Sequence, residues 1–250
     1  MRRYILAFAT VALVTPFPAA AQEAEHITRT IQMGPGGTLR LKNFSGRVRI
    51  TASDQPEVVI DAVRRAPRRR LERVQLDIRR ESATVVVIDA NRQDRSWFEF
   101  MGGSNVVETD FDIKVPRRTD LDLSVFSSAV TVEGVEGSHR AHSFSGRLAL
   151  NDVSGPIRAH TFSGAVVIRE KAWNDEQTIE VDTFSGNVEL HVPDSARGSV
   201  SFNSFSGRLN SVMPLTLHSS NRRSLRAELG GGGGGRLRFK TFSGSVQIDR

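Results

Sequence analysis

The sequence predicts an all-β protein whose strands stack as a single-chain parallel β-solenoid, with two strands in each coil of about 18–22 residues. Two patterns favour this fold: the tripeptide Phe-Ser-Gly recurs along the chain, and apolar and polar residues alternate on both sides of each copy. Only 38% of the 250 residues are hydrophobic, which suits a thin architecture with much surface rather than a large two-layer core.

The repeat sets the length of the expected strands and turns. Phe-Ser-Gly begins at six positions, and the near-copy Phe126-Ser127-Ser128 makes a seventh. Weaker copies begin at Val135 and Val153, so that positions 126 to 162 carry a copy every nine residues. This spacing predicts units of about five strand residues and four turn residues, with two units in each coil.

Residues on either side of the motif alternate as β-strands do. For the copy at Phe162 the apolar neighbours are Ala159, Val166 and Ile168, and the other copies are apolar at nearly all equivalent positions. Side chains two residues apart share one face of a strand, so the pattern predicts one buried and one outward face. An amphipathic helix would need apolar residues three or four positions apart.

We interpret Phe-Ser-Gly as a structural corner of the stack. Glycine permits positive φ in a tight turn, serine can bond a neighbouring backbone group, and phenylalanine can stack on its counterpart about 4.8 Å away. Contact of the Ser-Gly backbone with a ligand is the alternative interpretation. The predicted turn residues are Phe44, Gly46, Phe144, Gly146, Phe162, Gly164, Phe184, Gly186, Phe205, Gly207, Phe242 and Gly244.

A parallel stack explains the recurrence better than an antiparallel meander. Parallel coils place like residues on like residues, so the same residue types return in every coil. A meander also fits a nine-residue spacing, but it does not require near-identical corners at one end. We expect the parallel arrangement and keep the meander as the alternative.

The first 21 residues are typical of a secretory signal peptide. Two arginines precede an apolar run from Tyr4 to Val14, and small residues predict cleavage between Ala21 and Gln22; an uncleaved anchor is the alternative. The run is too short to span a bilayer, and no later stretch approaches the roughly 20 apolar residues required. We therefore expect an exported bacterial protein, periplasmic or at the cell surface, with no transmembrane segment after cleavage.

The chain resembles a bacterial envelope family of unknown function labelled "putative adhesin", whose members are β-strand-repeat proteins. The resemblance rests on the signal peptide, the strand-rich N-terminal part and the (Phe/Val)-Ser-Gly corners, and it covers most of residues 26–250. It implies a right-handed β-helix and no established enzymatic activity. The first third of the chain and the insertion before residue 236 depart from a regular ladder.

We expect one β-solenoid domain over residues 22–250, irregular over 26–115 and regular over 116–250. A Gly-rich insertion at 215–235 ends in six consecutive glycines, which are typical of a flexible linker. Helical turns at 66–74 belong to a short N-terminal cap region. A loop at 91–107 carries Trp97, Phe98, Phe100 and Met101, which could contact a partner or cover the sheet edge. Strands in the irregular part are expected at 27–31, 38–42, 47–51, 58–63, 76–78, 84–88 and 111–115.

One column of outward side chains contains a candidate metal site. In a parallel stack His142, His160 and Asp182 are successive neighbours, and two imidazoles with a carboxylate could hold Zn²⁺ or another divalent ion. The simpler interpretation is a polar exterior ladder, so the sequence assigns no metal. It also indicates no cofactor: the glycine run precedes a strand, whereas a dinucleotide motif follows a strand and opens a helix.

Arginine is concentrated near the expected helical turns. These side chains could meet phosphate or sulfate groups on envelope polymers or lipid headgroups, or they could form a solvated cap paired with Glu72 and Glu81. Nucleic acid is not expected as a partner of an exported protein. The candidate anion-binding residues are Arg64, Arg65, Arg68, Arg69, Arg70 and Arg73, followed by Arg79 and Arg80.

No catalytic residue is assigned. The chain has no cysteine, which excludes disulfides, thiolate metal sites and a cysteine nucleophile, and it lacks the common hydrolase and phosphate-binding motifs. We expect a non-catalytic envelope adhesin or scaffold whose partner is an envelope polymer, lipid headgroups or another surface protein; the sequence indicates no oligomeric state. The alternative is a carbohydrate-active enzyme that uses Asp120, Asp122 or the pair His142 and His160.

Overall fold

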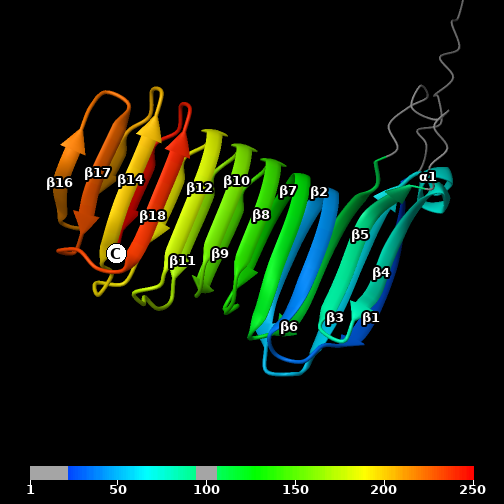
Figure 1. Ribbon diagram of the computed structural model, residues 1–250. Helices are drawn as coiled ribbons and strands as arrows, with labels where there is room; N and C mark the ends of the chain where they lie inside the picture. The colour runs from blue at the N-terminus through cyan, green and yellow to red at the C-terminus, as the bar shows by residue number, and fades with distance from the viewer. Residues whose placement is uncertain (1–21, 94–105) are drawn as a thin grey trace, which may run out of the picture.

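The computed structural model describes residues 22–93 and 106–250, and within these ranges it contains nineteen strands and one short helix (Figure 1). The elements are β1 (Glu23–Gln32), β2 (Gly37–Ser53), β3 (Glu57–Ala66), α1 (Arg68–Arg73), β4 (Val74–Ser82), β5 (Val85–Gln93), β6 (Glu108–Pro116), β7 (Thr119–Glu133), β8 (His139–Ser145), β9 (Leu148–Val153), β10 (Ile157–Ser163), β11 (Val166–Glu170), β12 (Thr178–Ser185), β13 (Val188–His191), β14 (Gly198–Ser204), β15 (Leu209–Ser211), β16 (Leu215–Ser220), β17 (Ser224–Leu229), β18 (Gly235–Thr241) and β19 (Val246–Asp249).

The predicted parallel β-solenoid, or right-handed β-helix, is wrong. All strands of the described ranges join one mixed sheet, which curls around the core as a nearly closed barrel. Antiparallel pairs occur near both ends: β1 with β3, β3 with β6 and β4 with β5 at one end, and β14 with β17 and β16 with β17 at the other. The prediction failed because the repeat specifies only how repeated strands pair, whereas the non-repeating segments form antiparallel pairs.

The central strands pair in parallel with equivalent residues in register. Ala159 of β10 lies between Ala141 of β8 and Val181 of β12, for example. The order in space differs from the order in the chain, because β18 lies between β12 and β14, and β19 lies between β13 and β15. Strand β2 likewise pairs with both β5 and β7 (Figure 1). Segments far apart in sequence are therefore direct neighbours.

The core forms because alternate residues point inward. In β10, Ile157 and Ala159 are buried, whereas Arg158 and His160 face outward. The inward positions of the other central strands hold mostly Leu, Ile and Val, which join one continuous hydrophobic cluster. The outward positions remain free to carry a site on a rigid sheet.

The Gly-rich insertion is folded rather than a linker. Strands β16 and β17 pair as an antiparallel hairpin, and the glycine run that follows forms the turn into β18. A Cβ atom at Gly235 would lie 2.6 Å from the Trp173 ring, so a larger residue has no room at that position. The helical turns expected at 66–74 correspond to α1.

Two expected features fall outside the described residues: the signal peptide at 1–21, and the aromatic residues Trp97, Phe98, Phe100 and Met101 of the 91–107 loop. Among the residues that are described, no helix is both long enough and apolar enough to cross a membrane.

Candidate functional site

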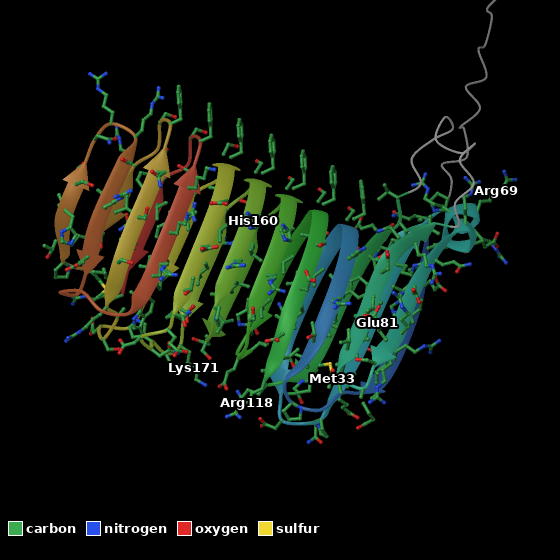
Figure 2. The ribbon with its side chains drawn as sticks, in the orientation of Figure 1. Met33, Arg69, Glu81, Arg118, His160 and Lys171 are labelled. Atoms are coloured by element: carbon green, nitrogen blue, oxygen red, sulfur yellow. The ribbon has the colours of Figure 1, made fainter. Side chains whose placement is uncertain are left out.

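Seven phenylalanine rings form a continuous row on the outside of the sheet, here called the phenylalanine row. Neighbouring ring centroids are 4.6–4.9 Å apart, and the planes of neighbouring rings are nearly parallel. Each residue of the row is 38–54% exposed. In Figure 2 a line of ring side chains projects along one edge of the sheet. In spatial order the row is Phe44, Phe126, Phe144, Phe162, Phe184, Phe242 and Phe205.

The row follows from parallel pairing in register. Equivalent residues of adjacent strands are separated by the strand spacing of about 4.8 Å, and flat rings at that distance stack face to face. The stacking that the repeat predicts is therefore present. The residue before each phenylalanine is inward, so the ring itself is outward. Because each ring covers the faces of its neighbours, the surface offered to solvent consists mainly of ring edges. Arg223 covers the ring of Phe205, its guanidinium carbon 4.6 Å from the centroid.

Each glycine of the Phe-Ser-Gly motif lies close to the backbone of a segment in a neighbouring strand layer, here called the next strand level. At Gly46, Gly146 and Gly164 the φ angle is positive, at 119°, 124° and 129°. Gly186, Gly207 and Gly244 are not among the glycines of positive φ. At all six, however, a Cβ atom would collide with a backbone carbonyl oxygen of a neighbouring strand level. Close approach, rather than φ alone, is the property these six positions have in common.

A groove of about 900 Å³ runs beside the phenylalanine row. Its far wall, here called the polar wall, consists of the outward residues two positions before six of the seven phenylalanines, all except Phe205; His160 is labelled in Figure 2 on the outer face of β10. The floor between the two rows is formed by residues such as Ser143, Thr161 and Thr183, which are themselves buried. The residues of the polar wall are Lys42, Ser124, His142, His160, Asp182 and Lys240. The groove thus has one aromatic and one polar side.

The structure brings the candidate metal ligands together as a stack. His142 pairs with His160 and His160 with Asp182 in the strand register. The imidazole centroids are 5.0 Å apart with planes 8° from parallel, and His160 Nδ1 lies 3.4 Å from Asp182 Oδ2. Nearly parallel rings direct their nitrogen lone pairs alongside one another rather than toward one point. Within residues 22–93 and 106–250, no group of three His, Cys, Asp or Glu residues could hold a metal ion.

The arginine cluster combines internal contacts with exposed side chains. Arg64 is buried, pairs with Glu25 at 2.5 Å and also donates to the Val74 carbonyl. Arg65 pairs with Asp110 at 2.7 Å. In α1, Arg70 donates to the Val106 carbonyl at 3.1 Å, and Arg68 pairs with Glu72 at 3.1 Å. In β4, Arg79 pairs with Asp77. Its neighbour Arg80 donates to the carbonyls of Ser82 and Ala83. Arg69 and Arg73 of α1 are exposed, and Figure 2 shows Arg69 at the end of the molecule that carries α1.

The Arg65 contact also changes the pKa of its partner. Burial by itself would raise the pKa of Asp110, but hydrogen bonds from the Arg65 side chain and the Arg47 backbone outweigh it. The pKa of Asp110 is therefore lowered, and this carboxylate stays ionised as part of the cap.

Arg64→Ala is expected to lower the free energy of unfolding by about 1–3 kcal/mol, because the substitution leaves a void and removes the donor to a backbone carbonyl. The exposed Arg68→Ala is the matched control and should change stability by less than about 0.5 kcal/mol. Urea denaturation of both variants measures the difference. Equal stability of the two would show that the internal contacts of Arg64 contribute little.

Sequence analysis missed two buried titratable residues. Burial lowers the pKa of His139 to about 4 and raises the pKa of Glu170 to about 8. Glu170 accepts a hydrogen bond of 3.0 Å from the Gln177 amide, whereas neither ring nitrogen of His139 makes a hydrogen bond of ordinary geometry. The signal was available: Glu170 and Ile168 are two residues apart on one strand, so their side chains share the inward face.

The two carboxylates considered for catalysis, Asp120 and Asp122, lie together on β7. Asp120 accepts a hydrogen bond of 2.8 Å from the Ser138 backbone N–H, which holds the neighbouring turn. Asp122 lies two residues away on the same face of β7, and both aspartates are half-buried on that strand. The observed geometry gives Asp120 a structural contact.

Comparison with solved structures finds similar folds. A "putative cell adhesion protein" from Clostridium sporogenes superposes with a TM-score of 0.52 at 11% identity, over 91% of this chain and 99% of that chain. A "putative adhesin" from Bacteroides fragilis is 11% identical with a TM-score of 0.29, over 90% of this chain and 97% of that chain. A "putative lipid binding protein" from Parabacteroides distasonis is 8% identical with a TM-score of 0.30, over the same shares.

Similarity at such low identity concerns the fold alone. No family model matches the chain, and no curated protein matches it. The chain is similar in fold to the putative cell adhesion protein from Clostridium sporogenes.

Proposed function

We propose that this chain is a non-catalytic, exported protein of the bacterial envelope that acts as an adhesin or scaffold through its phenylalanine row. The observation that carries the proposal is the exposure of seven stacked aromatic residues on one face. Monomeric proteins rarely leave so much contiguous apolar surface in water, and such patches commonly mark interaction sites. A polar wall runs along the same groove and can add specificity.

Three observations support binding rather than chemistry. The rings are held rigidly by the sheet, the histidines of the polar wall stack instead of converging, and Asp120 is engaged by a backbone N–H. Partners compatible with the groove are an envelope polymer, lipid headgroups or another surface protein. The similarity to adhesin-like folds and the signal-peptide pattern support a place in the periplasm or at the cell surface.

The competing function is a carbohydrate-active enzyme that acts on envelope polysaccharide through Asp120, Asp122 or the two histidines. Purified mature protein incubated with a panel of envelope polysaccharides distinguishes the two. We expect no release of reducing ends. Turnover that is lost in Asp120→Asn would overturn the non-catalytic proposal.

Retention on envelopes tests the role of the phenylalanine row. Mature protein is added to envelope fractions from cells that produce it, and we expect Phe144→Ser with Phe162→Ser to reduce retention at least tenfold. Val212→Ser with Leu217→Ser removes exposed apolar side chains elsewhere and should leave retention unchanged. If Arg68→Ala with Arg69→Ala abolishes retention while the phenylalanine variant binds normally, the exposed arginines of α1 form the binding surface instead.

A further inference from the structure

We propose that the occupant of the groove is a second copy of this chain, with the phenylalanine row of each copy lying in the groove of the other. The inference rests on the proposed function, because it names the partner of the same surface. It makes the adhesion or scaffolding contact homophilic: the surface recognises itself.

The spacing of the rings favours a partner that is itself a stack of paired strands. Neighbouring rings are 4.6–4.9 Å apart along the row, which is the spacing of strands in a sheet. A flexible polymer has no reason to match this period over seven rings. A second copy matches it at every ring, because its own row has the same period and the same length.

Ridge and groove lie side by side on one face, which is what self-recognition requires. A two-fold interface uses the same patch on both subunits, so the patch must carry both the projecting and the receiving part. Here the row projects and the adjacent groove, about 900 Å³ in volume, receives.

The symmetry axis then follows from the geometry. A two-fold axis that lies in the interface and is perpendicular to the rows would place one row directly on the other and leave both grooves empty. An axis parallel to the rows moves each row sideways into the partner's groove, and both rows then run in the same direction. Each ring thus faces the equivalent ring of the other copy.

The apolar area is sufficient for a specific dimer. An aromatic side chain presents about 200 Å², and rings that are 38–54% exposed leave roughly 600 Å² of ring surface on each copy. Covering both rows buries about 1,200 Å² in total, which is within the range of specific protein interfaces.

The charges of the polar wall do not oppose the approach of a second copy. Lys42 pairs in register with Asp89, and Asp182 pairs in register with Lys240. Opposite charges thus lie on adjacent strands near both ends of the groove, so the wall carries no block of one sign that would repel an identical surface.

The first test is the oligomeric state of the purified mature protein alone. Sedimentation equilibrium is expected to show a reversible dimer, and Phe144→Ser with Phe162→Ser should weaken its dissociation constant at least tenfold. Since these rings also stack on each other, a second variant, His142→Glu, places a charge in the groove and leaves the row intact. It should weaken dimerisation as well, whereas Val212→Ser with Leu217→Ser should not.

Single cysteines test the arrangement, since the chain contains none of its own. In the proposed dimer Ser127→Cys should cross-link to itself through a short bismaleimide, and so should Ser243→Cys. A mixture of the two should give no mixed product, because the rows run in the same direction. Mixed products without self-linked ones would overturn the proposed axis.

The outcomes separate this inference from the proposed function. A chain that is monomeric at all concentrations, but whose envelope retention still depends on the phenylalanine row, refutes the homophilic contact and leaves the binding function standing. Turnover of a polysaccharide refutes the binding function whatever the oligomeric state. A dimer that forms equally well in the phenylalanine variant and in His142→Glu refutes the groove as its interface.

Discussion

Gly164→Ala is expected to lower the free energy of unfolding by about 2–6 kcal/mol, since it combines backbone strain with overpacking. Gly164 has φ at 129°, a region that residues with a side chain rarely adopt, and a Cβ atom there would collide with the Gly146 carbonyl oxygen of the adjacent strand level. Gly146 is itself packed closely against the Ser128 carbonyl oxygen. The Gly146 backbone therefore cannot shift away from a Cβ atom at residue 164 without straining its own contact.

Thermal unfolding measures the effect, and a fall in melting temperature of about 5–20 °C is expected. Gly34→Ala is the matched control, because a Cβ atom at Gly34 meets no atom within 4 Å. Gly164→Val should lower the melting temperature more than Gly164→Ala does, because a β-branched side chain is larger and stiffer. Equal melting of Gly164→Ala and Gly34→Ala would contradict the close approach of strand levels at the corner.

The free energy of unfolding of the natural protein is expected to fall between about pH 6.5 and pH 8, and Glu170→Gln is expected to abolish this fall. Burial raises the pKa of Glu170 from 4.5 to about 8, so the folded state holds a proton that the unfolded state has released. The stabilising proton is fully retained below pH 4.5 and is lost as the pH rises through 8.

His139 has the opposite effect at lower pH. Its pKa falls from 6.5 to about 4, so unfolding takes up a proton there, and between about pH 4.5 and 6.5 this uptake offsets the proton released by Glu170. Above pH 6.5 only the Glu170 contribution remains. It amounts to about 2 kcal/mol over the 1.5 units up to pH 8.

Urea denaturation at pH 6.5 and pH 8 tests this prediction. Glutamine keeps an oxygen that can accept the Gln177 amide, so the variant should lose the pH dependence without losing the contact. Glu72→Gln on the exposed surface of α1 should behave as the natural protein does. If Glu170→Gln retained the full loss of stability between these pH values, Glu170 would not be the buried protonated group.

The repeat was informative about local structure and much less so about topology. Alternation around Phe162 correctly indicated strands with one inward face, and the recurrence of phenylalanine indicated ring stacking. The antiparallel strands β1, β4 and β17 carry no copy of the motif, so nothing in their sequence indicated which strand they would pair with. A pattern of residue types also contains no record of the order in which copies meet in space.

The candidate site could be predicted only in part. The stacked neighbours His142, His160 and Asp182 followed from the register, but the direction of their ring nitrogens did not, because it depends on side-chain rotation. The exposure of the phenylalanine row was also hidden in the sequence. Phenylalanine is usually a core residue, and only the pairing of strands shows that these rings cover one another instead of entering the core.

The placement of β18 and β19 has a consequence for how the chain acquires its structure. These strands lie near the C-terminus, yet Phe242 occupies an interior place in the row, between Phe184 and Phe205. During synthesis and export, β14 and β15 emerge before β18 and β19, and until then they lack a neighbour on the side facing β12 and β13. Assembly therefore cannot follow the order of the strands in the chain, because β18 and β19 take a place between strands that emerged before them.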